Sequence, residues 1–544
     1  MTEHFSLLLL LALCIGCGDS NESIAEDTGL APSLPFSGDA TDAINYEELA
    51  LAALKALAEG GDAEAMHEFA NRLSDGNTVD RDLDQAFQWY VKAAALPHAP
   101  SICALGNCYF YGRGVEHNFK KSTALYREAA DLGNPIALSN LGDNYLTGVG
   151  VKKDEAKAVE YFKKAAEAGD ALSNLKVMAC YHEGVGVKAS RQEAEKWKEL
   201  AIGTQNAEVF NSLGQLYLGG LMGKADEKKA RQYFLESAEA GFVDAYFELL
   251  YCLQEGIGGP RDTKQAEKWA ANLKKLAEAG DPAGMYWYGG MLSNGIGAKR
   301  DARASLDWFR QSAEQGHVPA IIEMISHYTD EQNRTADEKQ AFKWIKRGAE
   351  EGDYESIYQL AEYYYFGKGT VKNDQKAFKY GLIAAELGDI VSIGNVSYHY
   401  RYGVGVERNI PESMRWLKKG AEAGDPDAMN TLGFFYKEGQ FLNKDLTLAK
   451  RWLQKAADAG DKYAIQNLKD LNALANRKPQ DRGRNSCKTC QGDGFHTIET
   501  TRSCKPCHGT GLPSSFGGCS YCAGSGKLVY SSTTICYDCF TQNR

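Results

Sequence analysis

The sequence lacks an excess of positive charge, because 61 lysines and arginines face 72 aspartates and glutamates and leave a formal net charge of −11 at pH 7. Nucleic acids and anionic lipid headgroups are bound mainly by clustered Lys and Arg side chains. The charge balance therefore excludes both as partners of the chain as a whole. With 44% hydrophobic and 24% charged residues, the composition is that of a folded chain long enough for several domains.

A long hydrophobic run is also missing. The most apolar stretch, residues 6–16, reads SLLLLLALCIG, which is too short to span a bilayer comfortably but suits an export signal. It ends in Leu-Cys-Ile-Gly-Cys and resembles a bacterial lipoprotein box, in which the small Gly16 precedes Cys17. The resemblance implies that residues 1–17 form a signal with its lipobox and that Cys17 is lipidated. We therefore expect an exported, membrane-anchored lipoprotein of the periplasm or outer membrane.

Two departures from the lipoprotein pattern keep another reading open. Cys14 stands where such boxes usually carry Leu, and no Lys or Arg precedes the apolar run. The alternative is a disordered apolar N-terminus of a cytosolic protein. Residues 18–45 are rich in Ser, Asp, Gly and Pro in either case, which is typical of a flexible tether.

No set of residues with catalytic spacing is found in the sequence. His67 and Glu68 are followed by Asn71, where the helix of a zinc protease needs a second His. Three of the cysteines outside the termini, Cys108, Cys180 and Cys252, share one position of the repeat described below and are expected to be small core residues. The sequence thus predicts no catalytic residue.

A glycine recurs through most of the chain at intervals of 36 residues or twice that, with one interval of 39. These glycines are Gly61, Gly133, Gly169, Gly241, Gly280, Gly316, Gly352, Gly388, Gly424 and Gly460. The position 28 residues further on is aromatic in every unit but one, where it is Leu125. Its aromatic residues are Trp89, Tyr161, Trp197, Tyr233, Trp269, Trp308, Trp344, Tyr380, Trp416 and Trp452. Such a fixed period indicates a repeat architecture.

Each unit is predicted to form two helices joined by a turn. The first half repeats Ala and Tyr eight residues apart, as in Ala137 and Tyr145, and the second half repeats small and aromatic residues along one helical face. Between the halves, seven units carry Gly-x-Gly, and glycine accepts the positive φ that ends one helix and begins the turn. A single helical hairpin cannot bury both of its faces, so neighbouring units must stack.

Written as A-x-x-x-L-G-x-x-Y, G-x-G-V and K-A-x-x-W-x-x-K-A-A-x-x-G, these residues resemble the Sel-one-like repeats, which are relatives of the tetratricopeptide repeat. Eleven units fit between Gly61 and Gly460, with capping helices at residues 46–59 and 462–474. The resemblance implies an all-α superhelical solenoid over residues 46–475 that acts as an adaptor for other proteins. Residues 330–334 replace the eighth Gly-x-Gly, and Pro97 and Gln205 replace two leading glycines, so local irregularity is expected there.

Aromatic residues also gather at two first-helix positions, 6 and 10 residues after the leading glycine, in the later units. They are Phe247, Tyr251, Tyr286, Tyr358, Tyr398 and Phe434. These positions are about one helical turn apart and are not the consensus core positions, so they could line a groove for a protein or peptide partner, or a glycan. The alternative is that these rings pack between successive repeats.

Eight of the fourteen cysteines crowd into residues 487–544, after a basic linker at residues 476–486. They form four Cys-x-x-Cys pairs: Cys487/Cys490, Cys504/Cys507, Cys519/Cys522 and Cys536/Cys539. The first three pairs continue as Cys-x-Gly-x-Gly. One Cys-x-x-Cys turn supplies two thiolates, so two turns complete a tetrahedral zinc site and four turns predict two structural zinc ions.

The tail resembles the cysteine-rich domain of the DnaJ co-chaperones, which implies a small, β-hairpin-rich zinc module. The fourth pair lacks the glycines, and no His-Pro-Asp tripeptide occurs, so the co-chaperone's activating domain is missing. Each cysteine of the first two pairs recurs 32 residues later. Zinc could therefore be held within each half, or in the nested order that the resemblance implies, with the outer pairs on one ion and the inner pairs on the other. Disulfides are the alternative in an oxidising compartment, but they have no use for the glycines.

Together these patterns predict a non-catalytic scaffold or adaptor for protein partners, tethered to a membrane, with two structural zinc ions. Residues 477–544 have nine Lys and Arg against four Asp and Glu, and two zinc ions held by eight thiolates bring their net charge near +1, which argues against nucleic acid again. Two alternatives stay open. A thiol-active chaperone or disulfide exchanger would use the Cys-x-x-Cys pairs, and a hydrolase in the solenoid would need residues that the sequence does not name.

Overall fold

The computed structural model describes residues 45–46, 49–76, 79–220, 223–330, 336–476, 495–496 and 534–535. The predicted signal with Cys17, nearly all of the tether, the linker at 477–486 and the eight tail cysteines lie outside the described residues. The chain divides into two units, residues 1–425 and 426–544.

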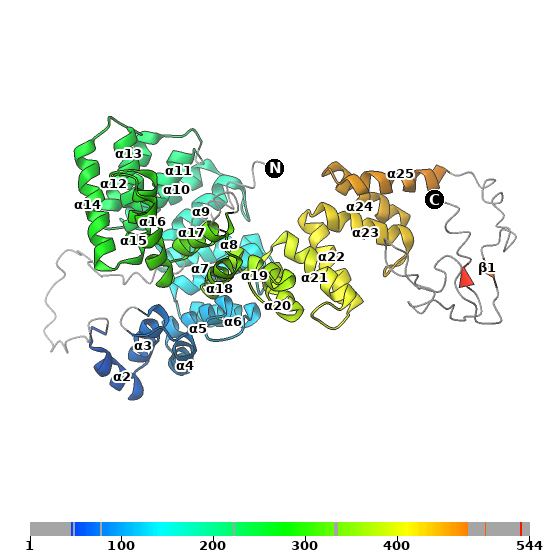
Figure 1. The fold of residues 1–544 in the computed structure, drawn as a ribbon, viewed down its shortest axis with the longest axis horizontal. Helices are drawn as coiled ribbons and strands as arrows, with labels where there is room; N and C mark the ends of the chain where they lie inside the picture. Colours follow the sequence, from blue (N-terminus) through cyan, green and yellow to red (C-terminus); the bar gives the residue numbers. More distant parts are fainter. Residues whose placement is uncertain are drawn as a thin grey trace. The chain divides into compact units, whose positions relative to one another are not determined.

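Helical hairpins follow one another through the first unit, as the repeat predicts (Figure 1). A capping helix, α2 (Leu51–Glu59), comes first. The first helices of units one to ten are α3 (Ala63–Asp75), α5 (Ala99–Tyr111), α7 (Pro135–Thr147), α9 (Ala171–Glu183), α11 (Ala207–Gly219), α13 (Val243–Glu255), α15 (Pro282–Asn294), α17 (Val318–Thr329), α19 (Tyr354–Phe366) and α21 (Ile390–Tyr402). The second helices are α4 (Leu83–Ala94), α6 (Phe119–Asp131), α8 (Glu155–Glu167), α10 (Arg191–Gly203), α12 (Glu227–Glu239), α14 (Thr263–Ala279), α16 (Ala302–Glu314), α18 (Glu338–Glu350), α20 (Asp374–Leu387) and α22 (Ile410–Ala423).

The second unit contains the eleventh hairpin, α23 (Pro426–Glu438) and α24 (Leu446–Asp458), and the C-terminal capping helix α25 (Lys462–Asn476). Two short strands follow, β1 (Phe495–His496) and β2 (Thr534–Ile535). They pair antiparallel, with Phe495 opposite Ile535. The all-α solenoid of eleven hairpins with capping helices is thereby confirmed over the part of the chain that the structure describes.

Short polar side chains and glycines set the ends of the helices. The Asn134 side chain accepts a hydrogen bond of 2.8 Å from the backbone N–H of Ala137 and so satisfies a free donor in the first turn of α7. The same helix ends at Gly148, which takes a left-handed φ of 83°. Because this pattern is written locally in each unit, the sequence alone was enough to predict where most helices end.

The repeats that were expected to be irregular behave in two ways. Gln205, which replaces a leading glycine, adopts the glycine conformation with φ 56°, so the turn is kept at the cost of a strained side-chain-bearing residue. In the eighth unit the turn changes, because α17 ends at Thr329 and its cap Asp330 is extended, with φ −74° and ψ 95°. The expected irregularity is therefore confirmed at the eighth repeat, whereas Gln205 preserves the regular turn.

Core packing pairs a large side chain of the second helix with a glycine of the first. Phe162 of α8 is fully buried and lies over Gly142 of α7, where a Cβ would come within 2.5 Å of the ring. Phe234 and Gly214 repeat the contact two units later. Glycine is thus needed at these first-helix positions because a phenyl ring occupies the space of its missing side chain.

The solenoid of the first unit winds far enough for early and late repeats to touch, as the positions of α5 and α6 beside α18 to α20 show (Figure 1). Arg81 donates two hydrogen bonds of 2.5 Å to the two carboxylate oxygens of Glu351. Arg113 donates to the Glu351 carbonyl at 3.0 Å, and Lys379 donates to Glu116 at 2.7 Å. These contacts join residues up to 270 positions apart in the sequence.

The cysteines of the solenoid lie in the core. Cys103, Cys108, Cys180 and Cys252 are all buried, as predicted for the last three. Burial raises the pKa of the Cys103, Cys180 and Cys252 thiols to about 12. Thiols of this kind stay protonated near neutral pH and are poor nucleophiles.

Candidate partner-binding surface

The six aromatic residues predicted to line a groove are distributed over several first helices. Phe247 and Tyr251 lie on α13, Tyr286 on α15, Tyr358 on α19 and Tyr398 on α21, while Phe434 lies on α23 of the second unit. Their surroundings differ, and so the structure separates them into groups with different roles.

Phe247 and Tyr286 take part in packing between successive repeats, which is the alternative that the sequence left open. The Phe247 ring of α13 stacks on Trp287 of α15 with centroids 4.8 Å apart, and the Tyr286 ring of α15 lies 5.2 Å from His317, the residue before α17. Trp287 in turn donates a hydrogen bond of 2.5 Å to Asp244. Burial raises the pKa of Tyr286 to about 12, which agrees with a ring enclosed by its neighbours. Tyr251 is 38% exposed.

Tyr358 and Tyr398, by contrast, line one pocket of about 480 Å³ between α19, α20 and α21. The lining consists of Tyr358, Ala361, Glu362, Tyr365, Phe366, Ala377, Gly381, Val391, Ser392, Asn395, Val396, Tyr398 and His399. We name this cavity the aromatic pocket. Its buried floor is formed by small and aliphatic residues, and its rim carries aromatic rings and a few polar groups, a combination typical of ligand and anchor sites.

Polar groups surround the rings of the aromatic pocket. Burial, followed by the nearby Glu362 carboxylate, raises the pKa of Tyr358 to about 12. Burial, followed by the neighbouring Tyr365, raises the pKa of Tyr398. His399 Nδ1 lies 2.7 Å from the carbonyl oxygen of Val404, which holds the imidazole in the floor. Both tyrosines are therefore neutral at physiological pH and present hydroxyl groups next to apolar ring faces.

The rim of the aromatic pocket is extended by exposed apolar side chains. Phe366 and Tyr402 are each 60% exposed, Val391 is 55% exposed, and Tyr402 contacts Tyr398 with ring centroids 4.8 Å apart. Sequence reasoning missed these residues. A signal existed, because Phe366 and Tyr402 share the last first-helix position of consecutive repeats, where most other units have polar or charged residues.

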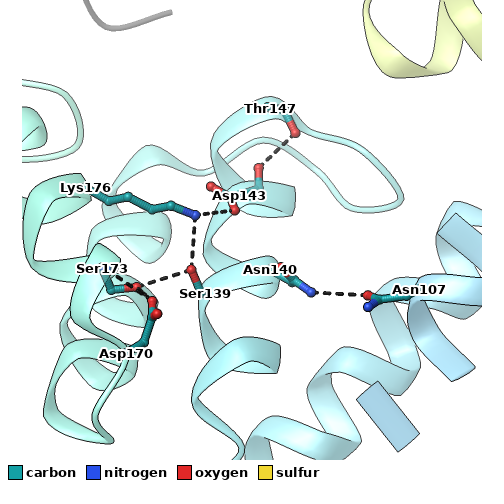
Figure 2. Close-up of polar contacts among 8 residues, drawn as sticks. All are labelled: Asn107, Ser139, Asn140, Asp143, Thr147, Asp170, Ser173 and Lys176. Carbon is teal, nitrogen blue, oxygen red and sulfur yellow. Dashed lines mark hydrogen bonds and ion pairs between the residues drawn. The ribbon is translucent and has the colours of Figure 1, made fainter. Parts of the chain in front are cut away.

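A cluster of polar side chains joins α5, α7 and α9, the first helices of the second, third and fourth repeats (Figure 2). Lys176 extends from α9 to α7, where its ammonium lies 2.7 Å from Asp143 Oδ2 and 3.0 Å from Ser139 Oγ. Ser173 also donates to Ser139 Oγ, at 3.2 Å. Burial raises the pKa of Asp143, and the nearby Lys176 ammonium opposes that rise.

This arrangement ties neighbouring repeats together. The Lys176 side chain is 6% exposed and forms an ion pair with Asp143. One repeat earlier, the same pair of positions holds Asn107 and Asn140, whose amides lie 3.4 Å apart. Lys176 and Asp143 thus form an ion pair at the repeat positions where Asn107 and Asn140 form a contact between amides.

Neither a metal site nor a membrane span is found in the part of the chain that the structure describes. No three His, Cys, Asp or Glu side chains there gather closely enough to hold a metal ion. No helix there combines the length and the apolar character required to cross a bilayer.

Comparison with protein families identifies the repeating unit. The Sel1 repeat model matches residues 63–98, 99–134, 135–170, 177–202, 211–242, 243–281, 282–317, 327–353, 355–389, 392–425 and 426–461. One match falls on each of the eleven hairpins.

Several solved structures are similar to the chain. A protective antigen of uropathogenic Escherichia coli with an SLR fold is 28% identical, with 80% of this chain and 92% of that chain covered and a TM-score of 0.36. A Sel1 repeat protein from Oxalobacter formigenes is 24% identical, with coverages of 64% and 90% and a TM-score of 0.29. An immunity protein from Pseudomonas aeruginosa is 19% identical, with coverages of 46% and 81% and a TM-score of 0.29.

Proposed function

Because the chain belongs to the Sel1-repeat family, whose solenoids are generally protein-interaction scaffolds, we propose that it is a non-catalytic scaffold for a protein or peptide partner. One observation carries the proposal. The aromatic pocket, with Tyr358 and Tyr398 in its wall, opens among the exposed side chains of Phe366, Val391 and Tyr402. Contiguous apolar surface around a pocket is typical of the centre of a protein interface.

The scaffold function is tested by capture of partners from the native organism on the immobilised full chain. We expect at least one protein to be retained by the wild type and lost from the double variant Phe366→Ser with Tyr402→Ser. The matched control is Tyr463→Ser on α25, which removes a tyrosine that is 76% exposed in the second unit. Equal retention by both variants would exclude this surface as the binding site.

For the tail we propose two structural zinc ions bound by Cys487, Cys490, Cys504, Cys507, Cys519, Cys522, Cys536 and Cys539, in the nested order. The nested order requires the segment after the first Cys-x-x-Cys pair to lie beside the segment before the fourth. β1 and β2 belong to these two segments, and their antiparallel pairing supports this order. Structural zinc in such a small module supplies most of its folding free energy, on the order of 10 to 16 kcal/mol per site.

Zinc content of paired variants separates the two orders. With nested pairing, Cys487→Ser with Cys539→Ser damages one site, so the full chain should keep about one of its two zinc ions. The matched variant Cys487→Ser with Cys504→Ser damages both sites and should lose both ions. Pairing within each half gives the reverse result. A wild-type chain without zinc, whose tail thiols react fast and reduce a model disulfide, would instead favour the thiol exchanger.

We further propose that Cys17 carries a lipid and that the mature chain is held at a membrane of the exported compartment. Cys17 is the cysteine that follows a small residue at the end of the apolar run. Cys17→Ser should move the protein from the membrane fraction to the soluble fraction, with Cys14→Ser as the matched control. An unchanged membrane fraction for Cys17→Ser would refute lipidation at this residue.

A further inference from the structure

The aromatic pocket lies where the ninth repeat has no side chain at a position that a larger side chain occupies in most other repeats. The filling position lies 29 residues after each leading glycine. From the first to the tenth repeat, this position is occupied in turn by Tyr90, Tyr126, Phe162, Lys198, Phe234, Ala270, Phe309, Ile345, Gly381 and Leu417. Only in the ninth repeat of this series is it a glycine.

The partner position on the first helix shows what is missing. A Cβ on Gly142 would meet the Phe162 ring at 2.5 Å, and a Cβ on Gly289 would meet the Phe309 ring at 2.8 Å. In the ninth repeat the pair is Ala361 and Gly381, where a Cβ on Gly381 would meet only the Ala361 Cβ, at 3.9 Å. The ring found at this position in the first, second, third, fifth and seventh repeats is therefore absent from the ninth.

The resulting cavity is matched to an apolar side chain. Its floor is formed by Ala361, Ala377, Gly381 and Val396, all buried, and its volume of about 480 Å³ exceeds that of a phenyl ring. An apolar floor offers no hydrogen bonds to hold an ordered water molecule. An apolar group that enters the pocket therefore gains van der Waals contacts with the floor. The repeats themselves show that phenylalanine fits this position, because Phe162, Phe234 and Phe309 occupy it elsewhere.

Charge on the lining favours one kind of neighbour for that ring. Glu362 is the acidic residue of the lining, and its carboxylate helps to raise the pKa of Tyr358. Asp389 and Glu355 also act on Tyr358, whereas Arg401 and Lys372 lie on the Tyr398 side. The Tyr358 side is thus acidic and aromatic, which suits a Lys or Arg side chain.

We propose that the aromatic pocket binds a phenylalanine side chain of a partner segment that carries a Lys or Arg next to it. The inference rests on the proposed scaffold function and names the chemistry of its partner. The phenyl ring takes the place of the missing filling residue of the ninth repeat, and the cation lies over the Tyr358 and Glu362 side of the rim. The partner thereby completes the core packing that the other hairpins complete by themselves.

The probe is a short synthetic peptide with 4-fluorophenylalanine beside lysine, titrated against the full chain and followed by ¹⁹F NMR. Saturable binding is expected for the wild type. The double variant Ala361→Gly with Gly381→Phe restores the Gly142 and Phe162 pair, so it should keep its helical signal and thermal midpoint yet weaken binding by at least about tenfold. Glu362→Gln should weaken binding about threefold, as for a partly exposed ion pair. The same neutralisation at the exposed Glu314 of α16 should leave binding unchanged.

The outcomes separate this inference from the scaffold function. No binding to the wild type at millimolar peptide, or equal binding to the filled variant, would overturn the inference. Equal binding of a control peptide with alanine in place of the fluorinated ring would also overturn it. Partner capture that is lost with Phe366→Ser and Tyr402→Ser but kept in the filled variant would leave the scaffold function standing without the phenylalanine anchor.

Discussion

Single residues at one repeat position alter the contact between neighbouring hairpins. Asn107 and Asn140 make a neutral amide contact, while Asp143 and Lys176 place a nearly buried ion pair at the equivalent positions one repeat later. A buried pair of charges gains little over a neutral pair, because desolvation offsets the attraction between the charges. Removal of one partner is far more costly, because the other charge is then left without compensation.

Lys176→Ala is therefore expected to destabilise the solenoid by about 3 kcal/mol, because Asp143 loses its counter-charge. The double variant Asp143→Asn with Lys176→Asn copies the Asn107 and Asn140 contact and should lie within about 1 kcal/mol of the wild type. Thermal and urea unfolding, followed by circular dichroism, would measure both. Equal losses in the two variants would show that the ion pair itself is stabilising.

His67 of α3 makes the early repeats sensitive to acid. Burial, followed by the nearby His98, lowers the pKa of His67 from 6.5 to about 4. Because the pKa of His67 is lowered in the folded state, the folded protein favours the neutral imidazole. Its contribution to stability is therefore intact above pH 6.5 and is lost as the pH falls from 6.5 towards 4. The loss should reach at most about 3 kcal/mol. His67→Leu should remove this part of the pH dependence, with the half-buried His182→Leu as the control. An unaltered acid transition in His67→Leu would contradict the assignment.

At the scale of elements, the two glycines of each Gly-x-Gly turn have different tasks. The first ends the first helix in the left-handed conformation, as Gly367 does with φ 75°. The second lies against the preceding repeat, and a Cβ on Gly369 would overlap the carbonyl oxygen of Glu338 at the start of α18. The turn thus joins two consecutive hairpins by close backbone contact as well as connecting its own two helices.

Gly369→Ala should accordingly cost more than a change at a leading glycine. Gly388 has φ 105° and nothing within 4 Å of a built Cβ, so Gly388→Ala should lose about 1 kcal/mol from backbone strain alone. Gly369→Ala adds a clash with fixed backbone and should lose at least about 3 kcal/mol. Thermal midpoints of the two variants decide the matter, and equal midpoints would argue against the close contact between repeats.

At the scale of the whole first unit, a carboxylate buried among arginines joins early and late repeats. Glu351 has a side chain that is 5% exposed and receives two hydrogen bonds from Arg81, while Arg347 Nε lies 2.9 Å from the same carboxylate. Tyr111 adds its ring beside Gly352, which leaves no room for a side chain there. Repeats that are far apart in sequence therefore stabilise one another, unlike those of a solenoid held by nearest neighbours alone.

Glu351→Gln should release this contact, because it removes the charge between the arginines, at a cost of about 3 kcal/mol. Hydrogen exchange should then rise together in α3 to α5 and in α18 to α19. The neighbouring Glu350→Gln is the matched control, since Glu350 is 46% exposed on its side chain, pairs with Lys346 and should cost less than about 0.5 kcal/mol. A rise limited to α18 would mean that the closure contact contributes little.

The sequence by itself determined the repeat, the number of hairpins and nearly all helix ends. Those features depend on contacts within 36 residues, on caps such as Asn134 and on turn glycines such as Gly148, so each unit states them locally. It also identified Tyr358 and Tyr398 as residues outside the consensus core. Their neighbours Phe366 and Tyr402 were overlooked, although a common repeat position marks them.

Only the tertiary structure decided which of the aromatic residues share a site and which fill the core. Phe247 stacks on Trp287 and Tyr286 contacts His317, so both rings lie between successive repeats, while Tyr358 and Tyr398 line a cavity beside Gly381. The pairing of Arg81 with Glu351 is likewise beyond sequence reasoning, because the small rotation from each hairpin to the next accumulates over many units before the two residues meet. A repeat pattern determines the geometry between neighbouring hairpins, but not which distant hairpins come into contact.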